Sequence, residues 1–142
     1  DEFREMMCVP NDYEAAMATG IYESHSSHAI DDNTVIQAGK LLRQKTNKAV
    51  FVTRGERGIA VFDDEGKYLF RPTLSLDGEI DPTGAGDTVA SAIAASLCAG
   101  GDLGEAAEIA NIAARVTVGK IGTNGTASQS EILACHDILG LV

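Results

Sequence analysis

The segment Asp81-Pro-Thr-Gly-Ala-Gly-Asp-Thr88 contains the residues with the clearest capacity for chemistry. Extended chain runs into Gly84-Ala85-Gly86, and we expect a helix to begin at about Asp87. Glycines at such a junction permit positive φ angles and a close approach of the backbone. The unpaired N–H groups and the dipole of a helix start attract anions. This spacing therefore suits a phosphate site built from backbone amides.

Asp87 needs its own explanation, because a carboxylate inside an anion site would repel a phosphate. As a general base, Asp87 would take the proton of a hydroxyl group that attacks a phosphoryl group, while the amides stabilise the developing charge. Alternatively, Asp87 only caps the helix and the glycines only form a tight turn. The spacing alone leaves both interpretations open.

Charge and composition limit the partners. The chain has 142 residues with 11 Lys+Arg and 21 Asp+Glu, a formal charge of −10, which argues against duplex nucleic acid and anionic membranes. A hydrophobic content of 44% excludes general disorder. The apolar runs are too short for a membrane span, and the charged start does not resemble a signal peptide. Any anion site must therefore be made locally, from amides, helix ends or a metal.

The cysteines and histidines offer no chemistry of their own. Cys8, Cys98 and Cys135 are far apart, so we expect no disulfide framework and a reducing, cytoplasmic location. Cys98 is expected to be a small core residue and Cys135 an ordinary helix residue. His25 and His28 are expected to lie in a solvated loop, since no further Cys or His ligands accompany them.

The pattern of apolar residues predicts a layered α/β fold that has too few strands to be complete. We expect a buried strand at Met6–Val9, stopped by Pro10, and a second buried strand at Lys48–Thr53. Strands Ile59–Phe62 and Lys67–Phe70 form a hairpin. Helices are expected at residues 11–19, 34–46, 88–99, 103–118 and 129–139, and the helix over 88–99 is apolar or small on nearly all sides, which predicts an interior position.

Four segments resemble motifs of the PfkB, or ribokinase-like, carbohydrate kinases. Asp81–Thr88 resembles the C-terminal signature of this family. Val9–Ala15 resembles its Asn-x-x-Glu motif, and Val52–Gly58 resembles its Thr-x-Gly-x-x-Gly nucleotide segment. Ala110–Thr123 is similar to the heptose-phosphate kinase branch, although the following loop is about one residue longer than in that branch. The resemblance runs from about Met6 to about Leu133.

The resemblance implies a ribokinase-like α/β fold, a three-layer (Rossmann-like) sandwich. It also implies that residues 1–142 are only the C-terminal part of such a kinase domain, namely the half that binds the nucleotide and carries the catalytic base. It also implies functional roles. These are a catalytic base at Asp87; an anion hole at the amides of Gly84, Ala85 and Gly86; ATP contacts at Thr53, Gly55, Gly58 and Asn111; magnesium at Asn11 and Glu14; and a monovalent cation such as K⁺ at Asp81, Thr83 and the carbonyls from Lys120 to Thr126.

Each of these positions also has a plainer interpretation. Asn11 and Glu14 could form a capping box, in which each side chain accepts the other residue's backbone N–H. Gly55 and Gly58 could merely shape a turn, and Asn111 could be solvated. Asp81 could brace the turn before Pro82, and Lys120 could be a surface residue.

The resemblance predicts ATP-dependent phosphoryl transfer to a sugar hydroxyl, with a heptose phosphate as the leading acceptor. Most sugar contacts and the lid of the family lie outside the matched motifs, so we expect the isolated chain to be inactive. We also expect it to self-associate through uncovered sheet edge and apolar surface. The alternatives are a non-catalytic nucleotide-binding or interaction module on the same scaffold, or a kinase of this family for another sugar or a nucleoside.

Overall fold

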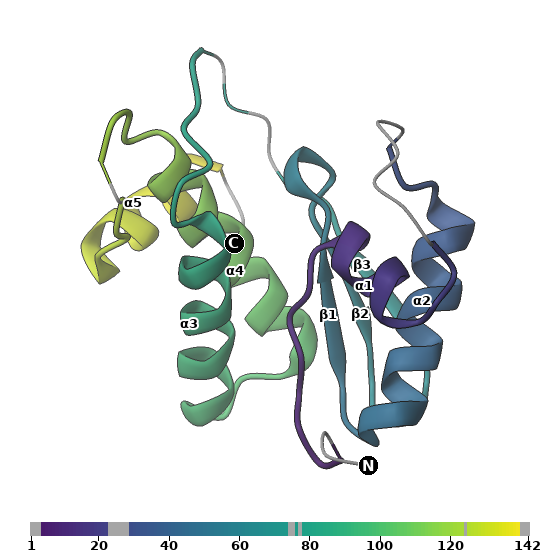
Figure 1. The fold of residues 1–142 in the computed structure, drawn as a ribbon. Coiled ribbons are helices and arrows are strands. Elements are labelled where there is room, and N and C mark those ends of the chain that lie inside the picture. Colours follow the sequence, from purple (N-terminus) through teal and green to yellow (C-terminus); the bar gives the residue numbers. More distant parts are fainter. Residues whose placement is uncertain (1–3, 23–28, 74–75, 77, 124, 140–142) are drawn as a thin grey trace. The chain divides into compact units, whose positions relative to one another are not determined.

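The computed structural model describes residues 4–22, 29–73, 76, 78–123 and 125–139. The chain divides into two units, Asp1–Arg71 and Pro72–Val142, which we call unit 1 and unit 2 (Figure 1). His25 and His28 lie outside the described residues, as does part of the extended stretch expected before Asp81. Among the helices of the described residues, none combines the length and apolar character needed to cross a membrane.

Unit 1 is built on a three-stranded antiparallel sheet in the order β1-β2-β3. Strand β1 (Val50–Thr53) pairs with β2 (Ile59–Phe62), and β2 pairs with β3 (Tyr68–Arg71) across a turn at residues 63–66. Every residue of β2 is buried, as are the first three of β1. These strands confirm the predicted buried strand and the hairpin.

Two helices of unit 1 pack on the sheet. Helix α1 (Asp12–Ala18) contacts helix α2 (Asp32–Thr46), and α2 contacts β1 and β2 (Figure 1). Helix α2 begins at its cap Asp31, whose carboxylate accepts the Thr34 N–H at 3.0 Å. The core between helices and sheet consists of Ala15, Ala16, Ile30, Val35, Ala38, Leu42, Val50, Val52, Ala60 and Phe62.

The buried strand predicted at Met6–Val9 is wrong. Within the described residues, this segment makes one isolated parallel bridge to β1, Cys8 with Val50, and a second bridge follows it at Asn11 with Thr53. The Cys8 and Pro10 carbonyls accept N–H groups of β1, whereas Pro10 has no N–H to return and so interrupts the ladder. Met6 and Met7 are exposed at this edge.

The described residues of unit 2 form three helices. Helix α3 (Ala85–Cys98) and helix α5 (Gln129–Leu139) both contact helix α4 (Leu103–Val118). Helix α4 begins in a capping box formed by Asp102 and Glu105. Small buried residues of α4, among them Ala106, Ala110 and Ala113, allow a close approach between helices.

Helix α3 is not interior on all sides, which corrects the prediction. Val89, Ile93 and Ser96 are buried on one side of the helix, whereas Ala94 and Ala95 are exposed. The reason is that α3 packs along α4 with a single stripe of side chains. Cys98 is likewise exposed rather than a core residue, because it lies outside that stripe.

Gly39 of α2 is a sensitive point in the packing of unit 1. A Cβ atom there would lie 2.0 Å from Cε2 of the buried Phe62 ring. We expect Gly39→Ala to lower the free energy of unfolding by about 1–3 kcal/mol, as measured by urea denaturation, because a well-packed core has to shift. Gly119→Ala is the control, since its backbone φ is −75° and its nearest contact is 3.6 Å. Equal stability of the two variants would contradict this packing.

Candidate functional site

The glycine segment Gly84–Gly86 forms the start of α3, and some of its backbone N–H groups have no acceptor within the described residues. Gly84 caps α3 at φ 80°, a left-handed conformation that favours glycine. The Ala85 N–H donates to the Pro82 carbonyl at 3.1 Å, and the Thr88 N–H donates to the Gly84 carbonyl at 3.0 Å. Within the described residues, the N–H groups of Gly86 and Asp87 donate to no acceptor. These two amides are therefore available to an anion.

Asp87 lies in the first turn of α3 and is exposed, so its carboxylate is open to solvent at the same helix end as the unused amides. The helix begins at Ala85, two residues before the predicted start. As the first residue of the helix, Ala85 already donates its N–H to the Pro82 carbonyl of the preceding turn. Of the three predicted anion-hole amides, those of Gly84 and Gly86 donate to no acceptor within the described residues, whereas that of Ala85 does. The roles of Asp87 and of the anion hole stay predictions.

Asp81 holds this junction to the loop that follows α4. Its two carboxylate oxygens accept the N–H of Thr83 and the N–H of Gly122, each at 3.0 Å. Its own N–H donates to the Val118 carbonyl at 2.8 Å. Hydrogen bonds from the Thr83 side chain and amide, and then from the Gly122 amide, lower the pKa of Asp81 below its ordinary value. Asp81 thus braces the turn, as its plainer interpretation held.

A second set of contacts joins the same two segments. The Thr117 hydroxyl of α4 and the Thr88 hydroxyl of α3 are 3.2 Å apart. Gly125 lies so close to α4 that a Cβ atom there would be 2.6 Å from the Thr117 carbonyl oxygen. A Cβ atom at Gly84 would in turn lie 3.7 Å from the Gly125 carbonyl oxygen. The junction and the loop after α4 therefore form one packed structure.

Lys120 is paired rather than merely a surface residue. Its ammonium group donates to the Thr126 carbonyl and lies 2.7 Å from a carboxylate oxygen of Glu131 on α5. The other carboxylate oxygen of Glu131 accepts the Ser128 hydroxyl at 2.7 Å and the Ser128 N–H at 2.9 Å. Hydrogen bonds from Lys120 and then from Ser128 lower the pKa of Glu131 to about 2.

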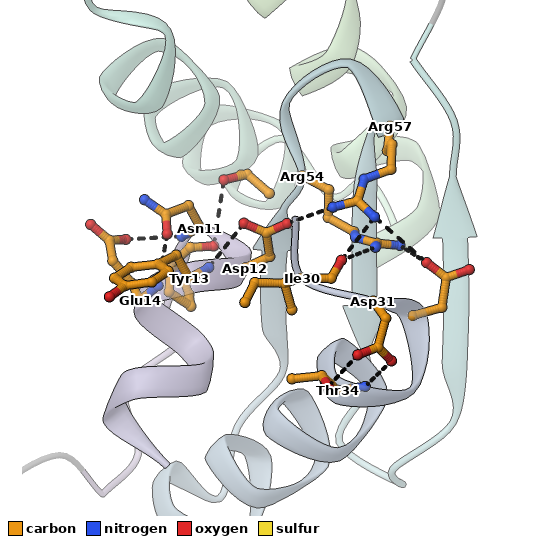
Figure 2. A network of polar contacts seen from close by, with 12 residues as sticks. Asn11, Asp12, Tyr13, Glu14, Ile30, Asp31, Thr34, Arg54 and Arg57 are labelled. Carbon is orange, nitrogen blue, oxygen red and sulfur yellow. Dashed lines mark hydrogen bonds and ion pairs between the residues drawn. The ribbon is translucent and has the colours of Figure 1, made fainter. Parts of the chain in front are cut away.

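In unit 1, Asn11 and Glu14 form the capping box of α1. The Asn11 side chain accepts the Glu14 N–H at 2.7 Å, and the Glu14 carboxylate accepts the Asn11 N–H at 2.9 Å (Figure 2). The bridge between Asn11 and Thr53 places this cap beside the end of β1. Within the described residues, no three His, Cys, Asp or Glu side chains cluster as metal ligands. The magnesium role of Asn11 and Glu14 therefore stays a prediction.

The predicted nucleotide segment forms a tight turn between β1 and β2. Gly55 opens a short 3-10 helix, η1 (Gly55–Arg57), at φ 56°, and Gly58 closes it at φ 101°. The Gly58 N–H donates to the Gly55 carbonyl at 3.1 Å. Thr53 precedes the turn, and its hydroxyl lies 3.5 Å from the Pro10 carbonyl. The turn exists as predicted, and its contact with ATP stays a prediction.

Two arginines that the sequence analysis did not single out fasten this turn. Arg54 and Arg57 both donate to the Ile30 carbonyl, at 3.2 Å and 2.9 Å (Figure 2). Arg57 also pairs with Asp12 at 2.9 Å, and Arg54 pairs with Asp32 at 2.7 Å. The turn is therefore tied both to the start of α1 and to the start of α2. Basic residues beside turn glycines in an acidic chain were the signal available in the sequence.

Unit 2 and unit 1 each bring together part of the predicted site. Unit 2 gathers the 81–88 segment and the loop after α4. Unit 1 gathers Asn11, Glu14 and Thr53 with the glycine turn. Asn111 of α4 belongs to unit 2, and its side-chain amide donates to the Pro72 carbonyl at 3.4 Å. Its predicted position near an adenine ring is not tested by these contacts.

Arg54 provides a test of the network in unit 1, because its side chain is only 3% exposed while its partner Asp32 is 76% exposed. Asp32→Asn should lower the free energy of unfolding by about 1–3 kcal/mol, since a buried guanidinium group loses its counter-charge. Urea denaturation measures the loss. Asp64→Asn, in the exposed turn between β2 and β3, is the control. Equal effects of the two substitutions would show that Arg54 does not depend on Asp32.

The low pKa of Glu131 predicts acid sensitivity. A carboxylate whose folded pKa lies near 2, below its ordinary value of 4.5, adds stability above pH 4.5 and loses it as the pH falls towards 2. We therefore expect Glu131→Gln to have a flatter stability curve than the parent protein between pH 4.5 and pH 2, measured by thermal unfolding. Glu65→Gln is the surface control. Parallel curves for Glu131→Gln and the parent protein would refute the assignment.

Solved structures show the fold to which these units belong. Ribokinase from Arabidopsis thaliana, complexed with ribose and ATP, matches 91% of this chain over 40% of its own length, with a TM-score of 0.77 and 25% identity. Phosphofructokinase-2 from Escherichia coli, in complex with potassium, matches 96% of the chain over 42% of its length, with a TM-score of 0.78 and 17% identity. These similarities confirm the predicted ribokinase-like α/β fold.

Sequence relatives agree with the structures. The bifunctional protein HldE of Shewanella piezotolerans is 39% identical over 127 residues, which cover 89% of this chain and 25% of the relative. HldE of Stutzerimonas stutzeri is 42% identical over 105 residues, 73% of this chain and 22% of the relative. The chain thus spans about a quarter of the length of the curated relatives it matches. The model of the pfkB family carbohydrate kinases matches residues 7–130. This chain therefore belongs to the pfkB family of carbohydrate kinases.

Proposed function

We propose that the protein carrying this chain transfers the γ-phosphoryl group of ATP to a sugar hydroxyl, and that this chain supplies the catalytic base. The observation that carries the proposal is the start of α3. There the unused amides of Gly86 and Asp87 and the exposed Asp87 carboxylate lie in one helical turn. Amides that suit a phosphate and a carboxylate that suits a hydroxyl are the two groups that phosphoryl transfer needs.

In the proposed reaction, the Asp87 carboxylate accepts the proton of the attacking sugar hydroxyl. The hydroxyl oxygen forms a bond to the γ-phosphorus, the bond from that phosphorus to the bridging oxygen breaks, and ADP leaves. The amides of Gly86 and Asp87, aided by the α3 dipole, stabilise the negative charge that develops on the phosphoryl oxygens. Gly84 and Asp81 position these amides through the cap and the brace described above.

In unit 1, the turn of Gly55 and Gly58 would contact the ATP phosphates and ribose through its backbone, with Thr53 beside it. Magnesium, when bound, supplies positive charge that neutralises the nucleotide phosphates. The exposed Asn11 and Glu14 fit such a role through metal-bound water, because one Glu14 oxygen caps α1 and the carboxylate has a second. Asn111 would lie near the adenine ring.

A heptose phosphate is the acceptor we propose first. Its support is the similarity of Ala110–Thr123 to the heptose-phosphate kinase branch and the occurrence of HldE proteins among the relatives. The chain covers only part of those relatives, so the acceptor contacts are proposed to lie mainly in an N-terminal portion. The alternative acceptors within the same family are another sugar or a nucleoside. A non-catalytic nucleotide-binding module is the alternative from a different functional class.

Asp87→Asn tests the proposed base in the full-length protein. Turnover should fall by about 10²–10⁴-fold, because the attacking hydroxyl no longer loses its proton to a carboxylate, while the affinity for ATP stays nearly unchanged. ADP release with ATP and a heptose phosphate measures turnover, and calorimetry measures ATP binding. Asp137→Asn on α5, whose side chain is 79% exposed, is the control.

Two outcomes would contradict the proposal. Near-normal turnover of Asp87→Asn would remove Asp87 from the role of base. Binding of ATP by the parent protein, without phosphorylation of any heptose phosphate, hexose, pentose or nucleoside, would favour the non-catalytic module instead.

A further inference from the structure

We propose that Arg57 is a positioning residue for the nucleotide, because it ties the glycine turn between β1 and β2 to the start of α1. The turn is the predicted contact of the ATP phosphates and ribose, and the start of α1 carries the predicted magnesium residues Asn11 and Glu14. The inference deepens the proposed function, on which its turnover measurement rests. Its binding measurement needs ATP alone and no sugar acceptor.

The turn has two backbone donors that its own fold leaves open. The Arg57 N–H donates to the Arg54 carbonyl at 3.1 Å. The Gly58 N–H donates to the Gly55 carbonyl, also at 3.1 Å. Within the described residues, the N–H groups of Gly55 and Glu56 donate to no acceptor, and both residues are exposed. Successive amides of a turn suit the oxygen atoms of a phosphate. Arg57 follows these two amides directly, and its anchorage therefore sets their position.

The Arg57 guanidinium group reaches two acceptors outside the turn. Its Nη1 donates to the Ile30 carbonyl and its Nη2 donates to Oδ2 of Asp12, each at 2.9 Å (Figure 2). Asp12 is the first residue of α1, and its side chain is only 19% exposed. A planar guanidinium group that serves two separate acceptors is fixed in orientation, which distinguishes this contact from an ordinary surface ion pair. The turn is therefore held at one orientation relative to the start of α1.

Asp12 completes the connection by using both of its carboxylate oxygens. Its Oδ1 accepts the Tyr13 N–H at 2.9 Å, whereas its Oδ2 accepts Arg57. Asp12 also lies between Asn11 and Glu14, which form the capping box of α1. A single carboxylate thus joins the first turn of α1 to the glycine turn. Two segments that are proposed to act on the same nucleotide keep a fixed separation in this way.

Arg57 differs in this respect from Arg54, the other arginine of the turn. Arg54 pairs with Asp32 of α2 at 2.7 Å, and its side chain is 3% exposed. The Arg57 side chain is 41% exposed, and among the described ion pairs of the two arginines, the one that reaches α1 belongs to Arg57. We therefore expect Arg54 to act mainly on stability and Arg57 mainly on the position of the turn.

Asp12→Asn tests the inference in the full-length protein. Asparagine has one acceptor oxygen for the two donors that Asp12 binds. If Asp12 acted only through its charge, loss of a negative charge beside the nucleotide would tighten ATP binding. We expect the opposite, a fall in ATP affinity of about fivefold or more, the lower limit of a typical coupling between sites. Calorimetry with and without magnesium measures the affinity. Asp64→Asn is the matched control, since it removes the same charge at the opposite end of β2.

Arg57→Lys provides the second arm of the test, because it keeps the positive charge but loses the two-pronged guanidinium group. ATP affinity should again fall about fivefold or more, and KM for ATP should rise by a larger factor than kcat falls. The double variant Asp12→Asn/Arg57→Lys should lose no more affinity than the more affected single variant, since both residues act through one contact.

Unchanged or tighter ATP binding by Asp12→Asn, or additive losses in the double variant, would overturn the inference. Urea denaturation establishes that each variant is folded under the conditions of the calorimetry. If Asp12→Asn is obtained only as insoluble protein, Arg57→Lys decides alone, and parental affinity of that variant would overturn the inference.

A failure of the proposed function would look different. A protein that phosphorylates no sugar, yet binds ATP and loses affinity through Asp12→Asn and Arg57→Lys, would refute the kinase proposal and support the role of Arg57. Normal turnover together with unchanged ATP affinity in both variants would support the kinase and refute the role of Arg57. A parent protein that binds no ATP would refute both.

Discussion

The conformation of the candidate anion site depends on one carboxylate, that of Asp81. Its two oxygens accept N–H groups from Thr83 and from Gly122, which are far apart in the sequence. This arrangement joins the turn before α3 to the loop after α4, and the packing of α3 on α4 extends the connection along both helices. Hydrogen bonds from Thr83 and Gly122 lower the pKa of Asp81 below its ordinary value, as expected for a charge-assisted brace.

In unit 1, positively charged side chains hold the glycine turn between β1 and β2. Its glycine turn has few side chains that could hold it, so Arg54 and Arg57 reach from the turn to the Ile30 carbonyl, Asp12 and Asp32. In this acidic chain, two of the 11 Lys and Arg residues therefore hold a backbone turn in place. In each unit, side chains hold a glycine-rich backbone segment to parts of the chain that are distant in sequence. A fixed backbone segment of this kind suits the recognition of phosphate by amide N–H groups.

Local chemistry explains why many of the predictions are confirmed. The bounds of α4 and α5 follow from helical periodicity, and the hairpin follows from apolar runs around Asp63–Gly66. The capping box of Asn11 and Glu14 could also be predicted from spacing. The errors arise where neighbours decide. Met6–Val9 is apolar but lies at a sheet edge beside Pro10, and α3 is rich in alanine but buries a single stripe.

The amino-acid sequence by itself determined the family, the local elements and the residue types of the candidate site, because motifs and periodicity are properties of neighbouring residues. Only the tertiary structure decided which distant partners those residues have. It assigned Gly122 to Asp81, Thr126 and Glu131 to Lys120, and Ile30 to the two arginines. The physical reason is that such hydrogen bonds and ion pairs form between segments separated by loops, and no local pattern encodes their pairing.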